Sequence, residues 1–399
     1  MTTVANEVLG VEAAHILQVY KRLPLVLVRG AGARVTDCDG REYIDLLSGI
    51  GVVSLGHGHT GLTRAIAAQA EELLHTSNLF FHPLQGELAA RLARLSGLQR
   101  AFFCNSGTEA VEACLKFARR YWHTAGSRER TEIVAFERSF HGRTFGSLSV
   151  TSGEPYRTPF APLLPGVRFV PPDDPEALRG AVTSATAAVI VEPIQGEGGV
   201  WPLSQAMADA LTVVCEETGT LLIADEIQCG LGRTGRPFHS AALGLRPDLM
   251  ALGKALGGGV PVGAALVGER VASAVRFGDH GSTYGGNLLA CRAALVFVDA
   301  LEDGLTERVA EAGAHLERGL RRLAAEHATV GEIRGAGLMR GVEVAPEAAD
   351  GIVAAGLERG VIVNRTAGTV VRLLPPLTIS DADIDEGLAR LGAALGDVS

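Results

Sequence analysis

The sequence predicts an α/β protein, with a mostly parallel sheet in a large domain and a smaller α+β domain behind it. Short apolar runs that fit buried strands alternate with helical segments between residues 101 and 267. Strands and helices in series are typical of a parallel sheet covered by helices on both faces. After about residue 290 longer helical stretches replace this alternation. A length of 399 residues is enough for two or three such units.

The expected strands and helices follow from these runs. The large domain has strand-like runs at 101–104, 133–136, 187–191, 221–224, 249–252 and 264–267, with helices at 109–121 and 205–218. The later part has helices at 291–302 and 305–325 and runs at 341–344, 361–364 and 370–374. We therefore expect an N-terminal segment, 1–45, that packs with the small domain, a large domain over 46–290, and a small C-terminal domain over 291–399.

Composition excludes several classes of function. The net charge is −9 and the chain has no polybasic run, so nucleic acid and anionic membranes are poor partners. No stretch approaches the length of a membrane span, and the first 25 residues do not resemble a secretory signal. The six cysteines form no C-x-x-C pair, which indicates neither a metal site nor a disulfide framework. We expect a protein of the reducing cytoplasm without a metal.

Lysine is rare in this chain. Only Lys21, Lys116 and Lys254 accompany 33 arginines. A lysine that persists among arginines can act as a nucleophile, which an arginine cannot, although chance retention explains any one of them equally well.

A first candidate site is the segment 105–110, Asn-Ser-Gly-Thr-Glu-Ala, which follows an apolar run and opens a helix. Ser106, Gly107 and Thr108 stand where free backbone N–H groups and the helix dipole favour a phosphate. An ordinary helix cap is the alternative explanation, and taken alone it is the more frequent one.

Two further candidates follow the next apolar runs. Asp225 ends the run 221–224, and an acid at the carboxyl end of a strand faces the ligand crevice of such folds. Lys254 ends the run 249–252 among glycines that permit a ligand to approach the backbone. A loop carboxylate and a lysine extending to solvent are the alternatives. Together, a phosphate cradle, an acid and a lysine are what pyridoxal 5′-phosphate (PLP) requires, since the acid pairs with the pyridine nitrogen and the lysine forms the imine.

The order of these motifs gives a resemblance over nearly the whole chain. The sequence resembles the class III aminotransferases of fold type I, and within them the acetylornithine aminotransferases. The resemblance implies a mostly parallel, seven-stranded sheet in the large domain. The motifs that carry it are Ser48-Gly49-Ile50, Leu55-Gly56-His57, 75–80, 104–110, 139–144, 191–200, 225–228, Gly253-Lys254, 280–287 and 372–377.

The resemblance implies roles for individual cofactor-binding residues. Lys254 binds the cofactor and then moves a proton between substrate and cofactor. Asp225 pairs with the pyridine nitrogen, Gln228 approaches the phenolic oxygen, and Phe140 stacks on the ring. Ser106, Gly107 and Thr108 hold the phosphate, Glu192 and His141 support the site, and Thr283 reaches the phosphate of a neighbouring subunit, which implies a homodimer.

The resemblance also implies how substrates bind. Arg143 takes the α-carboxylate of an acylated ornithine or the distal carboxylate of glutamate, and Arg372 takes the α-carboxylate of glutamate. Glu197 pairs with Arg372 and masks it while the ω-amino end of the donor enters. Ile50 stands where ornithine aminotransferases carry tyrosine, which favours a donor whose α-amino group is acylated or missing. Tyr20 is expected at the substrate entrance.

The activity expected from this resemblance is transfer of the δ-amino group of N2-acetylornithine to 2-oxoglutarate, in arginine biosynthesis. Succinylornithine, succinyl-diaminopimelate, carrier-linked lysine, ornithine and 4-aminobutyrate remain alternative donors. Cys229 and Leu288 depart from the usual threonine and proline of the family.

Two other classes of protein fit the sequence less well. A dinucleotide-binding oxidoreductase is suggested by the G-x-G-x-x-G spacing of 230–235, but Pro237 follows where a helix should open. A non-catalytic binding protein is disfavoured by the presence of both Lys254 and Asp225. A metal site at His57 and His59 lacks further ligands nearby.

Overall fold

A seven-stranded sheet forms the larger half of the molecule in the computed structural model, which describes residues 3–398. Its strand order is β4-β12-β11-β10-β7-β5-β6, and β12 runs opposite to the other six strands. The strands are β4 (Arg100–Cys104), β5 (Glu132–Phe136), β6 (Val167–Val170), β7 (Thr186–Val191), β10 (Leu221–Asp225), β11 (Leu249–Leu252) and β12 (Gly263–Val267). The predicted α/β class and the mostly parallel sheet are confirmed.

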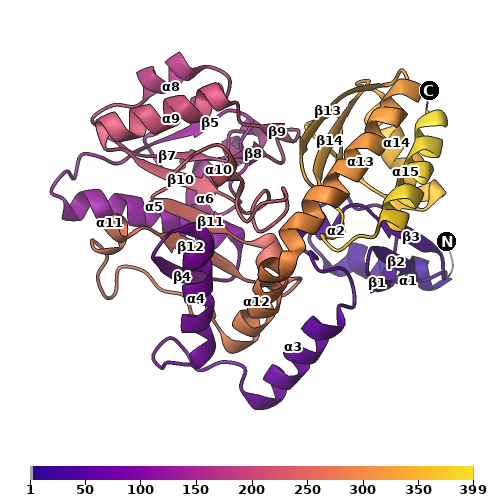
Figure 1. Ribbon diagram of the computed structural model, residues 1–399, viewed down its shortest axis with the longest axis horizontal. Helices are drawn as coiled ribbons and strands as arrows, with labels where there is room; N and C mark the ends of the chain where they lie inside the picture. Colours follow the sequence, from indigo (N-terminus) through magenta and orange to yellow (C-terminus); the bar gives the residue numbers. More distant parts are fainter. Residues whose placement is uncertain (1–2, 399) are drawn as a thin grey trace.

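Both faces of this sheet are buried, which explains why its strands are apolar without interruption. In β5, Ile133 and Ala135 pack with α5 (Gly107–Thr124), whereas Val134 and Phe136 pack with α8 (Pro175–Ala181) and α9 (Gln205–Thr218) on the other face. Successive side chains of a strand point to opposite faces, so each apolar run serves two helical layers. Figure 1 shows α5 and the α8–α9 pair on either side of the sheet.

The C-terminal part builds a second sheet, β13-β14-β17-β16, which is antiparallel throughout. Two long helices lead into it, α12 (Leu288–Ala300) and α13 (Thr306–Glu326), joined by the π-helical turn η3 (Leu301–Leu305). The other elements are β13 (Val330–Ala336), β14 (Met339–Val344), α14 (Ala348–Arg359), β15 (Val361–Ile362), β16 (Asn364–Thr366), β17 (Val370–Leu373) and α15 (Asp381–Gly396).

The N-terminal strands join this C-terminal part. A third sheet has the order β1-β2-β3-β15, in which Val361 and Ile362 pair in parallel with Ile44 and Asp45. In Figure 1 these N-terminal strands lie beside α14 and α15, away from the seven-stranded sheet. The elements before β4 are α1 (Thr3–His15), β1 (Leu27–Ala31), β2 (Arg34–Asp37), β3 (Glu42–Asp45), α2 (Ser48–Gly51), α3 (Thr60–Glu72) and α4 (Pro83–Ser96).

Short elements complete the larger half. They are α6 (Phe145–Ser149), α7 (Glu154–Arg157), η1 (Thr158–Phe160), β8 (Ile194–Gln195), β9 (Trp201–Pro202), α10 (His239–Ala242), η2 (Lys254–Gly257) and α11 (Glu269–Ala272). Within residues 3–398, no helix combines the length and the apolar character that crossing a membrane requires.

The helix α9 has the predicted bounds, whereas β6 and β13 were missed. The strand β6 is four residues long and contains Arg168, so it gives little apolar signal. The strand β13 contains Gly331, Glu332 and Gly335, and its pairing with β14 shifts register between Val330 and Ile333. Polar, glycine-rich strands with a bulge lack the alternation by which strands are recognised.

Candidate active site

A cavity of about 290 Å³ lies at the carboxyl ends of the parallel strands. Ligands of open α/β sheets bind at this edge. Each segment of its lining follows a different strand of the seven-stranded sheet. The lining residues are Ser106, Gly107 and Thr108 after β4, Phe140, His141, Gly142 and Arg143 after β5, Glu192 after β7, Asp225, Ile227 and Gln228 at the end of β10, and Lys254 after β11. The fold thus brings together residues separated by up to 148 positions in the chain.

The start of α5 forms one end of the cavity. Ser106 caps the helix, and its Oγ accepts a hydrogen bond from the Glu109 N–H at 3.3 Å. The Glu109 carboxylate accepts a hydrogen bond from the Asn105 N–H at 2.7 Å. A serine and a glutamate three residues apart therefore fix the turn. The next N–H groups of the first turn have no partner within the helix and make an anion site.

Glycines allow the backbone segments to meet at this end. A Cβ on Gly253 would lie 3.1 Å from the Gly107 Cα, and one on Gly107 would lie 2.8 Å from the Ile227 side chain. The residue before Lys254 therefore touches the helix start directly. This close approach places an amine beside an anion site, which fits the phosphate and aldehyde ends of PLP.

Asp225 is a buried acid, 4% exposed, that lines the cavity. Its Oδ2 shares a hydrogen bond with the His141 Nδ1 at 2.7 Å, and its Oδ1 accepts from the Ile227 N–H at 3.1 Å. Two partners hold the carboxylate in one orientation. An oriented acid in a cavity of this kind can pair with a protonated ring nitrogen.

Burial acts on Lys254 and Glu192 in different directions. It lowers the pKa of the Lys254 amine, and Arg372 lowers that pKa further, while Glu197 opposes the change. It raises the pKa of Glu192 to about 7, with His141 opposing and Asp225 adding to the rise. Glu192 accepts hydrogen bonds from the Phe140 and Gly196 N–H groups at 2.9 and 3.0 Å. A lysine with a lowered pKa supplies the neutral amine that carbonyl chemistry needs.

Backbone strain accompanies the site. Lys254 has a φ of 41° and Ile50 a φ of 63°, in a region that residues with a Cβ rarely occupy. Such conformations persist where the surrounding structure holds them, and they concentrate at functional sites.

The predicted arginines are held very differently. Arg372 is fully buried, and its Nη1 donates to Glu197 Oε1 at 2.5 Å and to Gln228 Oε1 at 3.1 Å, while its Nε donates to Asn364 Oδ1 at 3.2 Å. The Nη2 of Arg372 is buried without a hydrogen-bond partner in the described chain. Arg143 is exposed, and its guanidinium makes no hydrogen bond or ion pair with residues 3–398.

The charged neighbours of Glu197 lower the pKa of its carboxyl group. Burial by itself would raise the pKa of its carboxyl, but Arg372 and Lys254 outweigh burial and hold that pKa below its usual range. Gln228 Nε2 lies 3.4 Å from Glu197 Oε1, so Gln228 contacts both members of the ion pair.

Glu197, Arg372 and the three remaining predicted residues are not part of the cavity lining. Ile50 is 38% exposed in the kinked turn α2, and Tyr20 is 71% exposed in the segment between α1 and β1. Thr283 is exposed in the loop that precedes α12.

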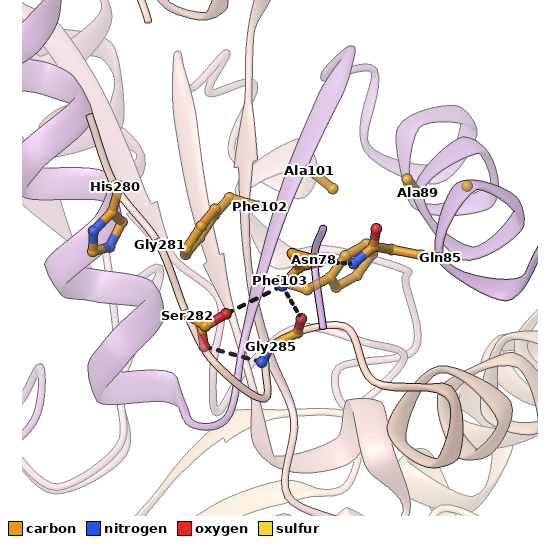
Figure 2. A pocket seen from close by; sticks show the side chains of 11 residues that line it. Asn78, Gln85, Ala89, Ala101, Phe102, Phe103, His280, Gly281, Ser282 and Gly285 are labelled. Carbon is orange, nitrogen blue, oxygen red and sulfur yellow. Dashed lines mark hydrogen bonds between the residues drawn. The ribbon is translucent and has the colours of Figure 1, made fainter. Parts of the chain in front are cut away.

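That loop borders a second pocket of about 390 Å³, shown in Figure 2. Asn78 Nδ2 donates to the Ser282 and Gly285 carbonyls at 3.1 and 3.0 Å, and the Gly285 N–H donates to Ser282 Oγ at 3.0 Å. The loop is therefore fixed on both sides of Thr283. The two pockets have no lining residue in common.

Cys229 and Leu288, which depart from the family pattern, are compatible with the structure around them. Cys229 is buried, and its thiol donates to Glu226 Oε2 at 3.2 Å, as a threonine hydroxyl in its place could. Leu288 is the first residue of α12, a position that favours proline but accepts other residues.

Two supporting residues were missed by the sequence analysis. Asn364 orients Arg372, and the Thr366 Oγ1 donates to the Glu197 carbonyl at 2.7 Å. Both lie on β16, whose polar residues gave no motif that could have marked them.

This chain is similar to known aminotransferases over nearly its whole length. The family model for aminotransferase class-III matches residues 17–395. An acetylornithine aminotransferase of Methanocaldococcus jannaschii is 46% identical over 94% of this chain and 95% of its own. The ornithine aminotransferase of Toxoplasma gondii superposes with a TM-score of 0.95 at 33% identity, covering 100% of this chain and 96% of that one. A PLP-bound amine transaminase from an uncultivated Pseudomonas species does so with a TM-score of 0.90 at 31% identity, covering 96% and 97%.

Proposed function

We propose that this chain, which belongs to the class III aminotransferases and uses PLP, transfers the δ-amino group of N2-acetylornithine to 2-oxoglutarate. The products are N-acetylglutamate 5-semialdehyde and glutamate, and we place the reaction in arginine biosynthesis. The observation that carries the activity is the meeting of Lys254, Asp225 and the start of α5 in one cavity. When bound, PLP supplies an electron sink that stabilises negative charge on the amine-bearing carbon.

The chain's own residues divide the remaining work. The first turn of α5 binds the phosphate, and Asp225, oriented by His141, keeps the ring nitrogen protonated. Phe140, which lines the cavity, would lie against one face of the ring. Lys254, whose pKa is lowered, would accept the proton from the substrate carbon and deliver it to the cofactor.

One residue bears on the α-carboxylate of the donor, and a second favours a donor whose α-amino group is acylated. The exposed, unpaired guanidinium of Arg143 lines the cavity and can take an α-carboxylate by a two-pronged contact. Ile50 offers no polar group to a free α-amino group, whereas ornithine aminotransferases carry tyrosine there. The 46% identity to an acetylornithine aminotransferase supports the same donor, although an ornithine aminotransferase superposes closely in fold.

We also propose that the protein is a homodimer and that it works in the cytoplasm. A homodimer is supported by the fixed, exposed loop around Thr283, which does not reach this chain's own cavity and can serve a partner. A reducing cytoplasm is supported by the five buried cysteines, none of which forms a disulfide within residues 3–398.

Single-turnover spectra test the donor. The PLP-loaded protein is mixed with N2-acetylornithine, ornithine or 4-aminobutyrate in the absence of a keto acid, and the visible absorption of the bound cofactor is followed. We expect loss of that absorption at far lower concentrations of N2-acetylornithine than of the other two amines. A preference for ornithine or 4-aminobutyrate would contradict the proposed donor but not the class of reaction.

A further inference from the structure

Tyr156 contacts two residues that line the cavity, and no part of the mechanism above uses it. It lies in the short helix α7 and is 42% exposed. Its ring lies under the Arg143 guanidinium, with 3.8 Å between the Arg143 Cζ and the ring centroid. Its ring also meets the Phe140 ring edge to face, with centroids 6.3 Å apart and planes at 85°. One side chain therefore contacts both the residue expected on the cofactor ring and the residue expected on the substrate carboxylate.

We propose that Tyr156 is a positioning residue for substrate binding, which holds Arg143 with its in-plane N–H groups free for the donor's α-carboxylate. This proposal rests on the proposed function, because it assigns Arg143 to that carboxylate. A guanidinium stacked on an aromatic ring uses its flat face for that contact. The five N–H donors lie in the plane of the group and remain available for a two-pronged bond to a carboxylate.

The alternative ways of holding Arg143 are absent from residues 3–398. No carboxylate forms an ion pair with it, and the only other contact that orients its guanidinium is the Phe140 ring, 5.4 Å from the Cζ. A long exposed side chain without such a contact samples many rotamers, and ordering it on binding costs conformational entropy. Contact with the ring lowers this cost before the substrate arrives.

A backbone hydrogen bond and the glycine at position 153 keep Tyr156 in this position. The Tyr156 N–H donates to the Gly153 carbonyl at 3.0 Å. A Cβ on Gly153 would lie 2.9 Å from the Tyr156 ring, so only glycine lets the ring settle here. On the other side, the loop that carries Arg143 is tied to Thr108, whose Oγ1 accepts from the Arg143 and Thr144 N–H groups at 3.2 and 3.3 Å. Both partners of the stack are therefore held by their backbones.

The contact is made by the ring and not by the hydroxyl, because the Tyr156 hydroxyl has no hydrogen bond in the described part of the chain. Tyr156→Phe is therefore the matched control for Tyr156→Leu. The first variant keeps the ring, whereas the second keeps an apolar side chain and loses the aromatic face.

The test is a double-mutant cycle on the PLP-loaded protein. Wild type, Tyr156→Leu, Arg143→Ala and the double variant are compared in single turnovers with N2-acetylornithine, and Tyr156→Phe is measured beside them. For Tyr156→Leu we expect the half-saturating concentration to rise about 3- to 30-fold, with a much smaller change in the limiting rate. Tyr156→Phe should retain most of the wild-type affinity. In the Arg143→Ala background, Tyr156→Leu should change affinity by less than about twofold.

Two results would overturn the proposal. One is a wild-type affinity in Tyr156→Leu. The other is an equal loss from Tyr156→Leu in both backgrounds, which would mean a structural role that does not pass through Arg143. The donor preference of the wild type is read in the same experiment, so failure of the proposed donor is recognised separately. If another carboxylate-bearing amine is preferred, the cycle is run with that amine.

Discussion

The Arg143 loop and the Arg372 strand offer the same functional group in opposite states. Arg143 is exposed, stacked on an aromatic ring and free of any ion pair with the described residues. Arg372 is fully buried on β17 and ion-paired with Glu197. A free guanidinium is ready for the first carboxylate that enters, whereas a masked one must exchange its internal carboxylate for an external one. We propose that the two substrates differ in whether they require Arg372 to leave Glu197.

The Nη2 of Arg372 has no hydrogen-bond partner among the described residues, so Glu197 does not satisfy every donor of this guanidinium. A buried donor without a partner costs free energy, and an incoming carboxylate can satisfy it. Exchange of Glu197 for glutamate's α-carboxylate would keep the charge balance and could satisfy this donor.

The largest effect is expected at Lys254, which should serve both substrates equally. Lys254→Met removes the group that binds the cofactor covalently and moves the proton. We expect both half-reactions to slow by at least about 10³-fold, while the circular dichroism of the fold is retained. Substantial turnover in this variant, measured by glutamate formation, would contradict the assignment.

Arg143→Ala comes next and should weaken both half-reactions. The same guanidinium is assigned to the α-carboxylate of the donor and to the distal carboxylate of glutamate. Losing a charged hydrogen-bond partner should raise the half-saturating concentrations of N2-acetylornithine and 2-oxoglutarate about 10- to 100-fold. A rise in the half-saturating concentration of only one of the two substrates would contradict the assignment of Arg143 to both.

Glu197→Gln should produce a smaller change of opposite sign. Removing the negative charge unmasks Arg372, so glutamate should bind about 3- to 10-fold more tightly in the reverse half-reaction. Because Arg372 and Lys254 hold the pKa of Glu197 below its usual range, the carboxylate is ionised throughout the neutral range. The ratio of glutamate affinities between variant and wild type should therefore not change between pH 6 and 8.

The smallest effect concerns Glu192, a buried acid without an arginine. Its pKa is raised from 4.5 to about 7 by burial, so the folded protein keeps a proton there that the unfolded chain has released. Stability should therefore fall as pH rises from about 4.5 to 7, by on the order of 1–3 kcal/mol. Glu192→Gln removes this dependence.

Thermal unfolding of the cofactor-free proteins at pH 5 and pH 8 measures the difference. The wild type should lose more Tm between the two pH values than Glu192→Gln does. Equal losses would mean that Glu192 titrates as it does in the unfolded chain.

Sequence alone predicted the parts of the site that follow uninterrupted apolar runs. Asp225 and Lys254 end strands buried on both faces, and their position at the carboxyl edge follows from the parallel order. Arg143 and Arg372 are two among 33 arginines, and only the family resemblance selected them. Their contrasting states depend on contacts across the chain, with Tyr156 and Glu197, which no local pattern contains. Likewise β13 was missed because its stability comes from pairing with β14 and not from its own apolar content.

The most direct test of the division between the two arginines is to measure both half-reactions in Arg372→Ala. Rapid mixing of the PLP-loaded variant with N2-acetylornithine follows the first half, and mixing of the amine-loaded form with 2-oxoglutarate follows the second. We predict that the first half stays within about threefold of wild type while the second slows by at least about 30-fold. Equal losses in both halves, or a loss confined to N2-acetylornithine, would contradict the assignment of Arg372 to the second substrate alone.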